Sequence, residues 1–175
     1  MEPSVERTRD DLTGLYSRKS ILDRSNYELD RARRYKHALS IIIFELDHFQ
    51  NMNDKYGHQG GDTVLKAVAD MCSHSLRSID LLGRSGGEEF YICLPETEPQ
   101  GALLTAERIR TEIEAMEIPF EGHKIKVTVS AGITGTDCVE DENLDSFLKS
   151  ADRALYAAKI EGRNCVRSEL LRMIS

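Results

Sequence analysis

The chain has 175 residues, of which 40% are hydrophobic and 30% are charged, and its net charge is −7. This size and composition predict one domain whose core needs no metal or disulfide to be stable. The acidic charge and the lack of a basic run argue against a nucleic-acid polymer as a partner. An acidic protein can still bind a polyphosphate when a divalent cation lies between the two sets of negative charge.

Neither membrane nor secretion signals are recognisable in the sequence. The apolar run 41–44 has the length of a short strand, and residues 1–11 lack an apolar signal region. The four cysteines have no CxxC spacing and indicate reduced thiols. We therefore expect a cytoplasmic location and no membrane contact by this domain. Residues 1–9 are interpreted as the end of a linker and 10–170 as the domain, as in the cytoplasmic part of a larger membrane-bound or sensory protein.

The first half of the chain predicts a helix, a strand and two more helices. Residues 17–36 place apolar side chains at helical spacing and predict an amphipathic helix. The sequence LSIIIFEL, 39–46, is apolar on both faces and indicates a central strand. A short helix and a glycine-containing turn are expected over 47–61. A further helix is expected over 62–78, with Asp62 as its N-cap.

The second half predicts a hairpin, a helix, a strand and a last helix. Residues 80–84 and 90–95 flank a Gly-Gly turn, which favours a hairpin. We expect an amphipathic helix over 100–116, one long alternating strand over 124–134 and a helix over 143–160 that Gly162 ends. Because hairpin-linked strands mix with helix-linked ones, the order predicts a mixed α/β (α+β) sheet with helices packed around it.

Carboxylates occur at two places that this order could bring together. Glu45 and Asp47 should share one face at the exit of the central strand, which suits Mg²⁺. Glu88 and Glu89 follow the hairpin glycines and would reach Glu45 if the hairpin pairs with the central strand. Each feature alone is better explained by a solvated strand end or loop. Three or four converging carboxylates, however, would repel one another without a cation.

Two further groups of residues have the chemistry to bind a nucleotide. Asn53 has an amide donor and acceptor, and Asp62 accepts two bonds, which matches the paired N–H donors of a guanine edge. A turn residue and a helix cap are the alternatives for these two. The amides of His48 and Phe49, at the start of a short helix, could receive phosphate oxygens.

Lys159 and Arg163 are spaced i, i+4 at the end of the last helix. Cations at this position complement the helix dipole, which alone would explain them. They could equally reach a triphosphate. The spacing does not decide between the two.

Taken together, four motifs resemble the GGDEF family of diguanylate cyclases over almost the whole chain. They are similar to the family's opening D-x-LTGL-x-NR motif, its D-x-D-x-FK-x-x-ND-x-x-GH-x-x-GD block, its signature hairpin in the GGEEF form and its closing helix. In this chain they read DLTGLYSR (11–18), FELDHFQNMNDKYGHQGGD (44–62), RSGGEEF (84–90) and ADRALYAAKIEGRN (151–164).

The resemblance implies a palm-like, nucleotidyl-cyclase fold with a central, mostly antiparallel five-stranded sheet surrounded by helices. It implies condensation of two GTP into cyclic di-GMP and two pyrophosphates by a homodimer, with Mg²⁺ or Mn²⁺ as cofactor. The paired glycines would let the backbone approach the nucleotide. The implied roles are metal binding by Glu45, the Leu46 carbonyl and Glu88; catalysis by Glu88 and Glu89; guanine recognition by Asn53 and Asp62; and phosphate binding by His48, Phe49, Gln50, Lys159 and Arg163.

The sequence RSID, 77–80, lies five residues before GGEEF, as in the family's inhibitory product site. The resemblance therefore implies feedback inhibition by cyclic di-GMP bound to Arg77, Asp80 and Arg108. Arginine suits this role because it binds phosphate bidentately and stacks on bases. The simpler interpretation of an R-x-x-D pattern is a surface ion pair.

Three positions depart from the family pattern. Glu45 replaces the first Asp of the D-x-D block and reaches one methylene farther, Gln50 replaces a phosphate-binding lysine, and Ser85 replaces an aromatic residue. Glu45 and Gln50 favour a rival hypothesis, a degenerate module that binds GTP or cyclic di-GMP without turnover. A third hypothesis, a cyclase acting on one nucleotide, is disfavoured for adenine by the Asn53 and Asp62 pair.

Overall fold

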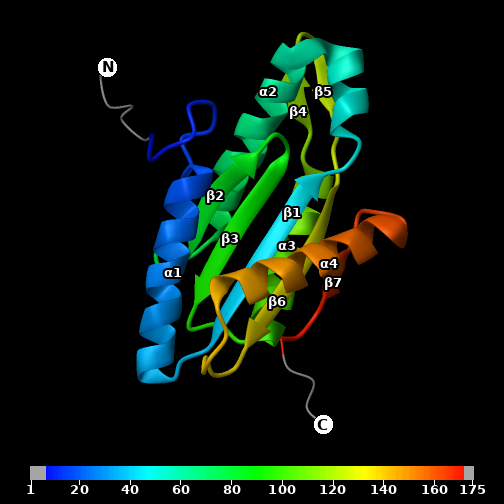
Figure 1. Ribbon diagram of the computed structural model, residues 1–175. Coiled ribbons are helices and arrows are strands. Elements are labelled where there is room, and N and C mark those ends of the chain that lie inside the picture. The colour runs from blue at the N-terminus through cyan, green and yellow to red at the C-terminus, as the bar shows by residue number, and fades with distance from the viewer. Residues whose placement is uncertain (1–6, 172–175) are drawn as a thin grey trace.

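A computed structural model describes residues 7–171, so 1–6 of the expected linker lie outside the described residues. A five-stranded sheet has the order β2-β3-β1-β6-β7, and its neighbours are antiparallel except β6 and β7. This confirms the mixed α/β class and the mostly antiparallel sheet (Figure 1). The elements are α1 Arg18–Tyr35, β1 Leu39–Leu46, α2 Phe49–Ser75, β2 Leu81–Gly86, β3 Glu89–Pro95, α3 Pro99–Ala115, β4 Ile118–Phe120, β5 His123–Ile125, β6 Val129–Thr136, α4 Leu144–Ile160 and β7 Val166–Ser168.

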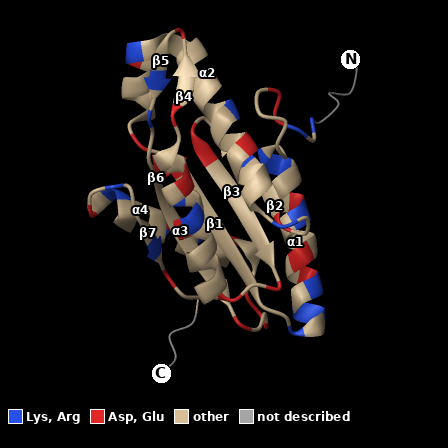
Figure 2. Ribbon diagram, turned by 180° about the vertical axis from the view of Figure 1, so that it is seen from behind, with Lys and Arg blue, Asp and Glu red and all other residues tan. Residues whose placement is uncertain are grey.

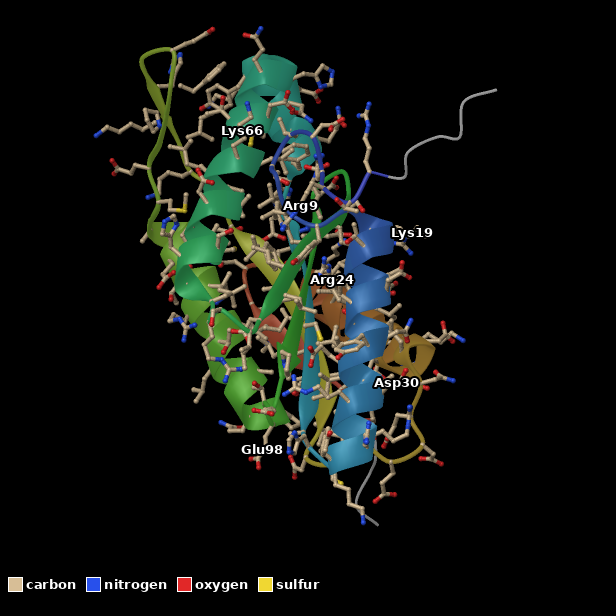
Figure 3. The ribbon with its side chains drawn as sticks, turned by 90° about the vertical axis from the view of Figure 1, so that its left-hand side faces the viewer. Arg9, Lys19, Arg24, Asp30, Lys66 and Glu98 are labelled. Carbon is tan, nitrogen blue, oxygen red and sulfur yellow. The ribbon has the colours of Figure 1, made fainter. Side chains whose placement is uncertain are left out.

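Helices cover both faces of the sheet and bury β1 at its centre. Ile41 and Ile43 pack in a cluster with residues of α1 and α4, while Ile42 and Phe44 pack in a larger cluster with residues of α2 and α3. Figure 3 shows the strands between α1 on one side and α2 and α3 on the other. Burial of apolar side chains on both faces explains why the sequence of β1 is apolar throughout. The charged residues lie mainly on the helices and at strand ends (Figure 2).

The expected N-cap at Asp62 is wrong. Helix α2 runs from Phe49 to Ser75 with a kink at Gly57, whose φ of 74° and ψ of 173° are non-helical. The second half of the helix therefore starts just after Gly57, and Asp62 lies within it. Glycine takes a positive φ without steric cost, so the break occurs there. The sequence pattern instead predicted the break at the later glycine pair, Gly60 and Gly61.

The long strand expected over 124–134 is also wrong in its bounds. It is divided into β5, which ends at Ile125, and β6, which begins at Val129. Strand β5 pairs with β4 in a separate two-stranded sheet, and β7 adds an edge to the main sheet. The strands β4, β5 and β7 have three residues each, too few to show an alternating pattern.

The contact between β6 and α4 gives a test of the packing. A Cβ on Gly132 would lie 2.2 Å from the Ala151 carbonyl oxygen and 2.3 Å from the Leu155 nitrogen, both backbone atoms. We expect Gly132→Ala to lower the free energy of unfolding by about 1–3 kcal/mol, measured by urea denaturation. Gly101→Ala in α3 is the control and should not lower the free energy of unfolding, because its added methyl meets only the Thr97 side chain, which can move, and alanine favours a helix. Equal stability of wild type and Gly132→Ala would contradict this packing.

Candidate active site

Two glutamates face each other where the central strands end. Glu45 on β1 is the register partner of Glu89 on β3. Burial raises the pKa of the Glu89 carboxyl, a hydrogen bond from Ser85 lowers it, and the charge of Glu45 raises it further. Glu45 forms an ion pair with Lys159 of α4. The sequence prediction that the hairpin brings its carboxylates to Glu45 is thus confirmed for Glu89.

The hairpin tip is attached to the end of β1 through Glu88. The amide of Leu46 donates to the Glu88 carbonyl, with an N···O distance of 3.2 Å. Glu88 itself is half-buried. The Gly86 and Gly87 backbones have φ of 146° and 49°, and a Cβ at either position would meet no atom within 4 Å. The turn therefore needs these glycines for their backbone conformation rather than for space within this chain.

Ser85 has a role that the sequence did not reveal. Its hydroxyl donates to Glu89 Oε1 at 2.6 Å. The register of β2 and β3 shifts between Arg84 and Gly86, which is a bulge at the position of Ser85. A bulge redirects a side chain, so Ser85 can bond the carboxylate four residues later. The sequence predicts two strands joined by a turn, but it does not show where a bulge will lie.

Asp152 was also missed and lies near the same carboxylates. Burial and the charge of Glu45 raise the pKa of its carboxyl, while Arg18 and Lys159 lower it. Asp152 and Lys159 are seven residues apart on α4, a spacing that places both on one helix face. That spacing was the sequence signal that could have identified Asp152. The end of the sheet thus collects Glu45, Glu89 and Asp152 with the cations Lys159 and Arg18.

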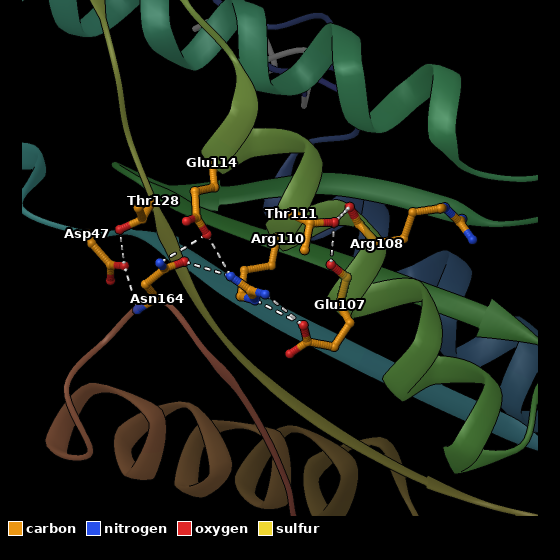
Figure 4. A network of polar contacts seen from close by, with 8 residues as sticks. All are labelled: Asp47, Glu107, Arg108, Arg110, Thr111, Glu114, Thr128 and Asn164. Carbon is orange, nitrogen blue, oxygen red and sulfur yellow. Dashed lines mark hydrogen bonds and ion pairs between the residues drawn. The ribbon is translucent and has the colours of Figure 1, made fainter.

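Asp47 does not share the position of Glu45. Strand β1 ends at Leu46, so the alternation that predicted a shared face does not extend to Asp47. Its side chain is 7% exposed and accepts hydrogen bonds from Ser130 Oγ at 2.6 Å, Thr128 Oγ1 at 2.7 Å and the Asn164 amide at 3.0 Å. Figure 4 shows the bonds to Thr128 and Asn164. Asp47 is therefore committed to protein contacts, and the predicted carboxylate pair is not formed.

The kink in α2 places Asn53 beside the residue that precedes Asp62. A Cβ on Gly61 would lie 1.9 Å from Asn53 Oδ1, so these residues are in close contact. That oxygen is buried and has no hydrogen-bond partner among residues 7–171. Asp62 is exposed. An unpaired buried acceptor costs free energy in the protein alone.

The start of α2 leaves backbone amides available. His48, at the N-cap, has a φ of 55° and makes no side-chain capping bond. The amides of the first helical turn, which begins with Phe49, have no intrahelical acceptor. Gln50 is exposed and its Nε2 donates to Asp54 at 3.0 Å. The start of α2 therefore borders the site next to the end of β1.

Arg163 lies beyond the last helix rather than at its end. Helix α4 ends at Ile160, and Arg163 has a φ of 64° in the turn that follows. The helix dipole therefore explains Lys159 but not Arg163. The Arg163 side chain is exposed and makes no hydrogen bond or ion pair within residues 7–171.

The RSID segment lies at the other end of the sheet. Arg77 Nη2 pairs with Asp80 Oδ1 at 3.0 Å and donates to Thr97 Oγ1 at 2.6 Å and to the Pro95 carbonyl at 3.2 Å. Pro95 is the register partner of Leu39, at the opposite end of β1 from Glu45. Arg108 donates to the Ser75 hydroxyl and carbonyl at 3.1 and 2.9 Å. Arg77 and Arg108 thus both lie at the end of α2.

Arg84 connects the hairpin tip to the segment that precedes α1. Its Nε donates to the Gly87 carbonyl at 2.8 Å, and its Nη1 lies 3.2 Å from both carboxylate oxygens of Asp10. In the same segment the Tyr16 ring centroid lies 4.0 Å from the guanidinium carbon of Arg9 and 4.4 Å from that of Arg24 in α1. Figure 3 labels both arginines. The tip is therefore fixed from both sides, by Leu46 and by Asp10.

Within residues 7–171, no three His, Cys, Asp or Glu side chains are grouped closely enough to form a metal site on their own. In the same range, no helix has the length and apolar character required to cross a membrane.

Comparison with known proteins identifies the family. Residues 7–165 match the family model described as "Diguanylate cyclase, GGDEF domain". The chain belongs to this family. The GGDEF chain is 40% identical to "Diguanylate cyclase A" of Treponema denticola over 80% of its own length and 38% of the relative's. It is 38% identical to "Diguanylate cyclase DgcP" of Pseudomonas aeruginosa over 89% and 23%. It therefore spans less than half of the length of either relative.

Solved structures agree with this assignment. The GGDEF domain of DgcB from Caulobacter crescentus, in complex with c-di-GMP, matches with a TM-score of 0.86 and 31% identity over 96% of this chain and 97% of that one. Diguanylate cyclase SiaD from Pseudomonas aeruginosa, in complex with its activator SiaC, matches with a TM-score of 0.87 and 35% identity over 92% and 61%. These neighbours confirm the palm-like GGDEF fold that the sequence motifs implied.

The Asp10–Arg84 pair gives a pH-dependent test of how the hairpin tip is held. Burial alone would raise the pKa of Asp10, but hydrogen bonds from Thr13 and the charge of Arg84 lower it below its ordinary value of 3.8. A lowered folded-state pKa adds stability above the ordinary value and loses it as the pH falls through the folded value. Asp10→Asn should therefore lower the free energy of unfolding by about 1 kcal/mol at pH 7. The difference from wild type should shrink toward pH 3, as measured by urea denaturation.

The control for this test is Asp11→Asn. Asp11 pairs with Arg7, but the two side chains are 72% and 74% exposed. Exposed pairs contribute little, so the substitution should change the unfolding free energy by no more than about 0.5 kcal/mol. A loss in Asp10→Asn that stays the same from pH 7 to pH 3 would contradict the electrostatic contribution of Asp10.

Proposed function

We propose that residues 10–170 form a cytoplasmic diguanylate cyclase domain that condenses two GTP into cyclic di-GMP and two pyrophosphates as a homodimer. The observation that carries the proposal is the Glu45–Glu89 pair at the end of the central strands, bordered by the GGEE turn. Two opposed carboxylates near one cation are poorly suited to a purely structural role, because like charges directly opposite destabilise a sheet. Membership of the GGDEF family supports the same reaction.

The residues present fit a divalent cation. Glu45, the Leu46 carbonyl and Glu88 offer only hard oxygen donors, with no more than two carboxylates, which is the donor set that Mg²⁺ prefers. The repulsion between Glu45 and Glu89 is a second indication, because added positive charge would relieve it. When bound, Mg²⁺ or Mn²⁺ would neutralise phosphate charge and lower the pKa of the attacking hydroxyl.

Glu89 is proposed to accept the proton of the 3′-hydroxyl. Each GTP would use that hydroxyl to attack the α-phosphate of the other, with pyrophosphate as the leaving group. A carboxyl whose pKa is raised is a better proton acceptor than an ordinary one near neutral pH. Glu88 would support the same step from the metal side.

The remaining site residues are proposed to hold GTP. Asn53, with its unpaired Oδ1, and the exposed Asp62 would recognise the guanine edge. The amides of His48 and Phe49 suit phosphate oxygens, because a helix N-terminus is electropositive. Lys159, Arg163 and Gln50 would contact the phosphates, with Lys159 exchanging its contact with Glu45 for the substrate.

A second function is supported by one specific feature. Glu45 is paired with Lys159, and Gln50 is bonded to Asp54, so two positions that depart from the family pattern already have partners in the chain. This favours the rival of a degenerate module that binds GTP or cyclic di-GMP as a sensor. The assay below separates the two, because the rival binds nucleotide without turnover.

The enzyme proposal is tested by incubating the protein with GTP and Mg²⁺ or Mn²⁺ and separating the nucleotides. Cyclic di-GMP should form, and Glu89→Gln and Glu88→Gln should each lower its rate by about a hundredfold or more, because each removes a group that acts in the chemical step. Glu117→Gln, an exposed glutamate paired with Lys124, is the control and should match wild type. A dimeric wild type that binds GTP but forms no product would support the sensor instead.

We also propose that Arg77, Asp80 and Arg108 bind cyclic di-GMP as a feedback inhibitor. Arg77 is 54% exposed while its partner Asp80 is 3% exposed, so the guanidinium is held in place and remains accessible. The similar GGDEF domain of DgcB was solved in complex with c-di-GMP.

The inhibitory site is tested with Arg77→Ala. Loss of a charge-assisted contact should raise the cyclic di-GMP concentration for half-inhibition by about tenfold or more. Arg34→Ala, an exposed arginine at the end of α1, is the control and should keep wild-type inhibition. Circular dichroism should show both variants folded. Unchanged inhibition in Arg77→Ala would reduce RSID to a surface ion pair.

A further inference from the structure

The two segments proposed to hold phosphates meet at one buried carboxylate. Asp47 directly precedes His48 and Phe49, and it accepts the backbone amide of Asn164, which directly follows Arg163. The same carboxylate accepts hydrogen bonds from Ser130, which belongs to β6, and from Thr128, which directly precedes β6. The Asp47 amide also donates to the Thr128 carbonyl at 2.8 Å. Backbone and side chain of Asp47 are therefore both held in place.

The turn that carries Arg163 has an unusual backbone. Arg163 and Asn164 have φ values of 64° and 46°, so two successive residues other than glycine are left-handed. Asparagine tolerates this region and arginine does so less well. Such a conformation persists only where the surroundings determine it. The Arg163 amide donates to the Ala158 carbonyl at 3.0 Å, and the Asn164 amide bonds Asp47.

A second set of contacts fixes the Asn164 side chain. Its Oδ1 accepts from Arg110 Nη1 at 3.0 Å, and its Nδ2 donates to Glu114 Oε2 at 3.1 Å. Arg110 is held in turn by Glu107 and Glu114 on α3, as Figure 4 shows. The turn after α4 is thus attached to Asp47 through the Asn164 backbone amide and to α3 through the Asn164 side chain.

We propose that Asp47 is a positioning residue that holds the Arg163–Asn164 turn so that Arg163 faces the β- and γ-phosphates of GTP. This inference rests on the proposed function. Arg163 is exposed and makes no polar contact within residues 7–171, so its own side chain does not set its direction. The backbone sets it, and Asp47 is the group that joins that backbone to the start of α2.

The test measures binding rather than turnover. The probes, used with Mg²⁺ in calorimetry, are a GTP analogue with a methylene bridge between its α- and β-phosphates, and GMP, which lacks the β- and γ-phosphates. Asp47→Asn should weaken the triphosphate analogue by about tenfold and change GMP binding by less than about twofold. Asp70→Asn, an exposed site on α2 with the same charge change, should bind both probes as wild type does.

A double-mutant cycle shows whether Asp47 acts through Arg163. If it does, Asp47→Asn should cause no additional loss of triphosphate affinity in an Arg163→Ala background. Thr128→Val removes a single bond to Asp47 and gives a milder variant in case Asp47→Asn does not fold. It should show the same loss, smaller and confined to the triphosphate.

The outcomes separate this inference from the proposed function. A wild type that binds neither probe would overturn both. A wild type that binds both probes, with Asp47→Asn or Thr128→Val losing GMP and triphosphate equally, would leave the proposed function standing and overturn the positioning role. Additive losses in the Arg163→Ala background would also overturn it.

Discussion

The like-charge contact between Glu45 and Glu89 constrains the structure around it. These two residues are opposite each other on adjacent antiparallel strands, an arrangement that destabilises a sheet. The next pair inward, Phe44 and Phe90, is stacked with ring centroids 4.9 Å apart in the buried core. Apolar burial along the rest of the ladder keeps the register fixed, so the carboxylates cannot separate by slipping. A slip of one residue would move each side chain of the strand to the opposite face and disrupt its packing in the two core clusters.

The like-charge contact explains several neighbouring features. Lys159 on α4 neutralises Glu45, the Ser85 hydroxyl bonds Glu89, and the bulge before Gly86 allows that bond. The tip is then fixed by the Leu46 amide on one side and by Arg84 on the other. Each of these reduces the repulsion or limits the movement of the carboxylates.

The elements that could be predicted from the sequence are those with a long pattern. The four long helices, β1 and the β2–β3 hairpin follow from helical spacing, a continuous apolar run and a glycine turn. The break in α2 could not be located, because Gly57, Gly60 and Gly61 are all candidates and only the dihedral angles decide. The strands β4, β5 and β7 have three residues each and are defined by pairing with distant segments, which leaves no local signal.

The site residues likewise divide into those that the sequence predicts and those that it does not. Sequence motifs identified Glu45, Glu88 and Glu89, and strand pairing could be expected to bring them together. Asp47 was misread because alternation was extended one residue beyond the strand, and its partners Ser130 and Asn164 are 83 and 117 residues away.

The geometry also fixes where a ligand can lie. Glu45 and Glu89 face α1 and α4, while Asn53 and Asp62 belong to α2 on the opposite face of the sheet. A molecule that touches both sets must pass around the end of the sheet beyond Leu46, where β1 stops and the chain turns into α2.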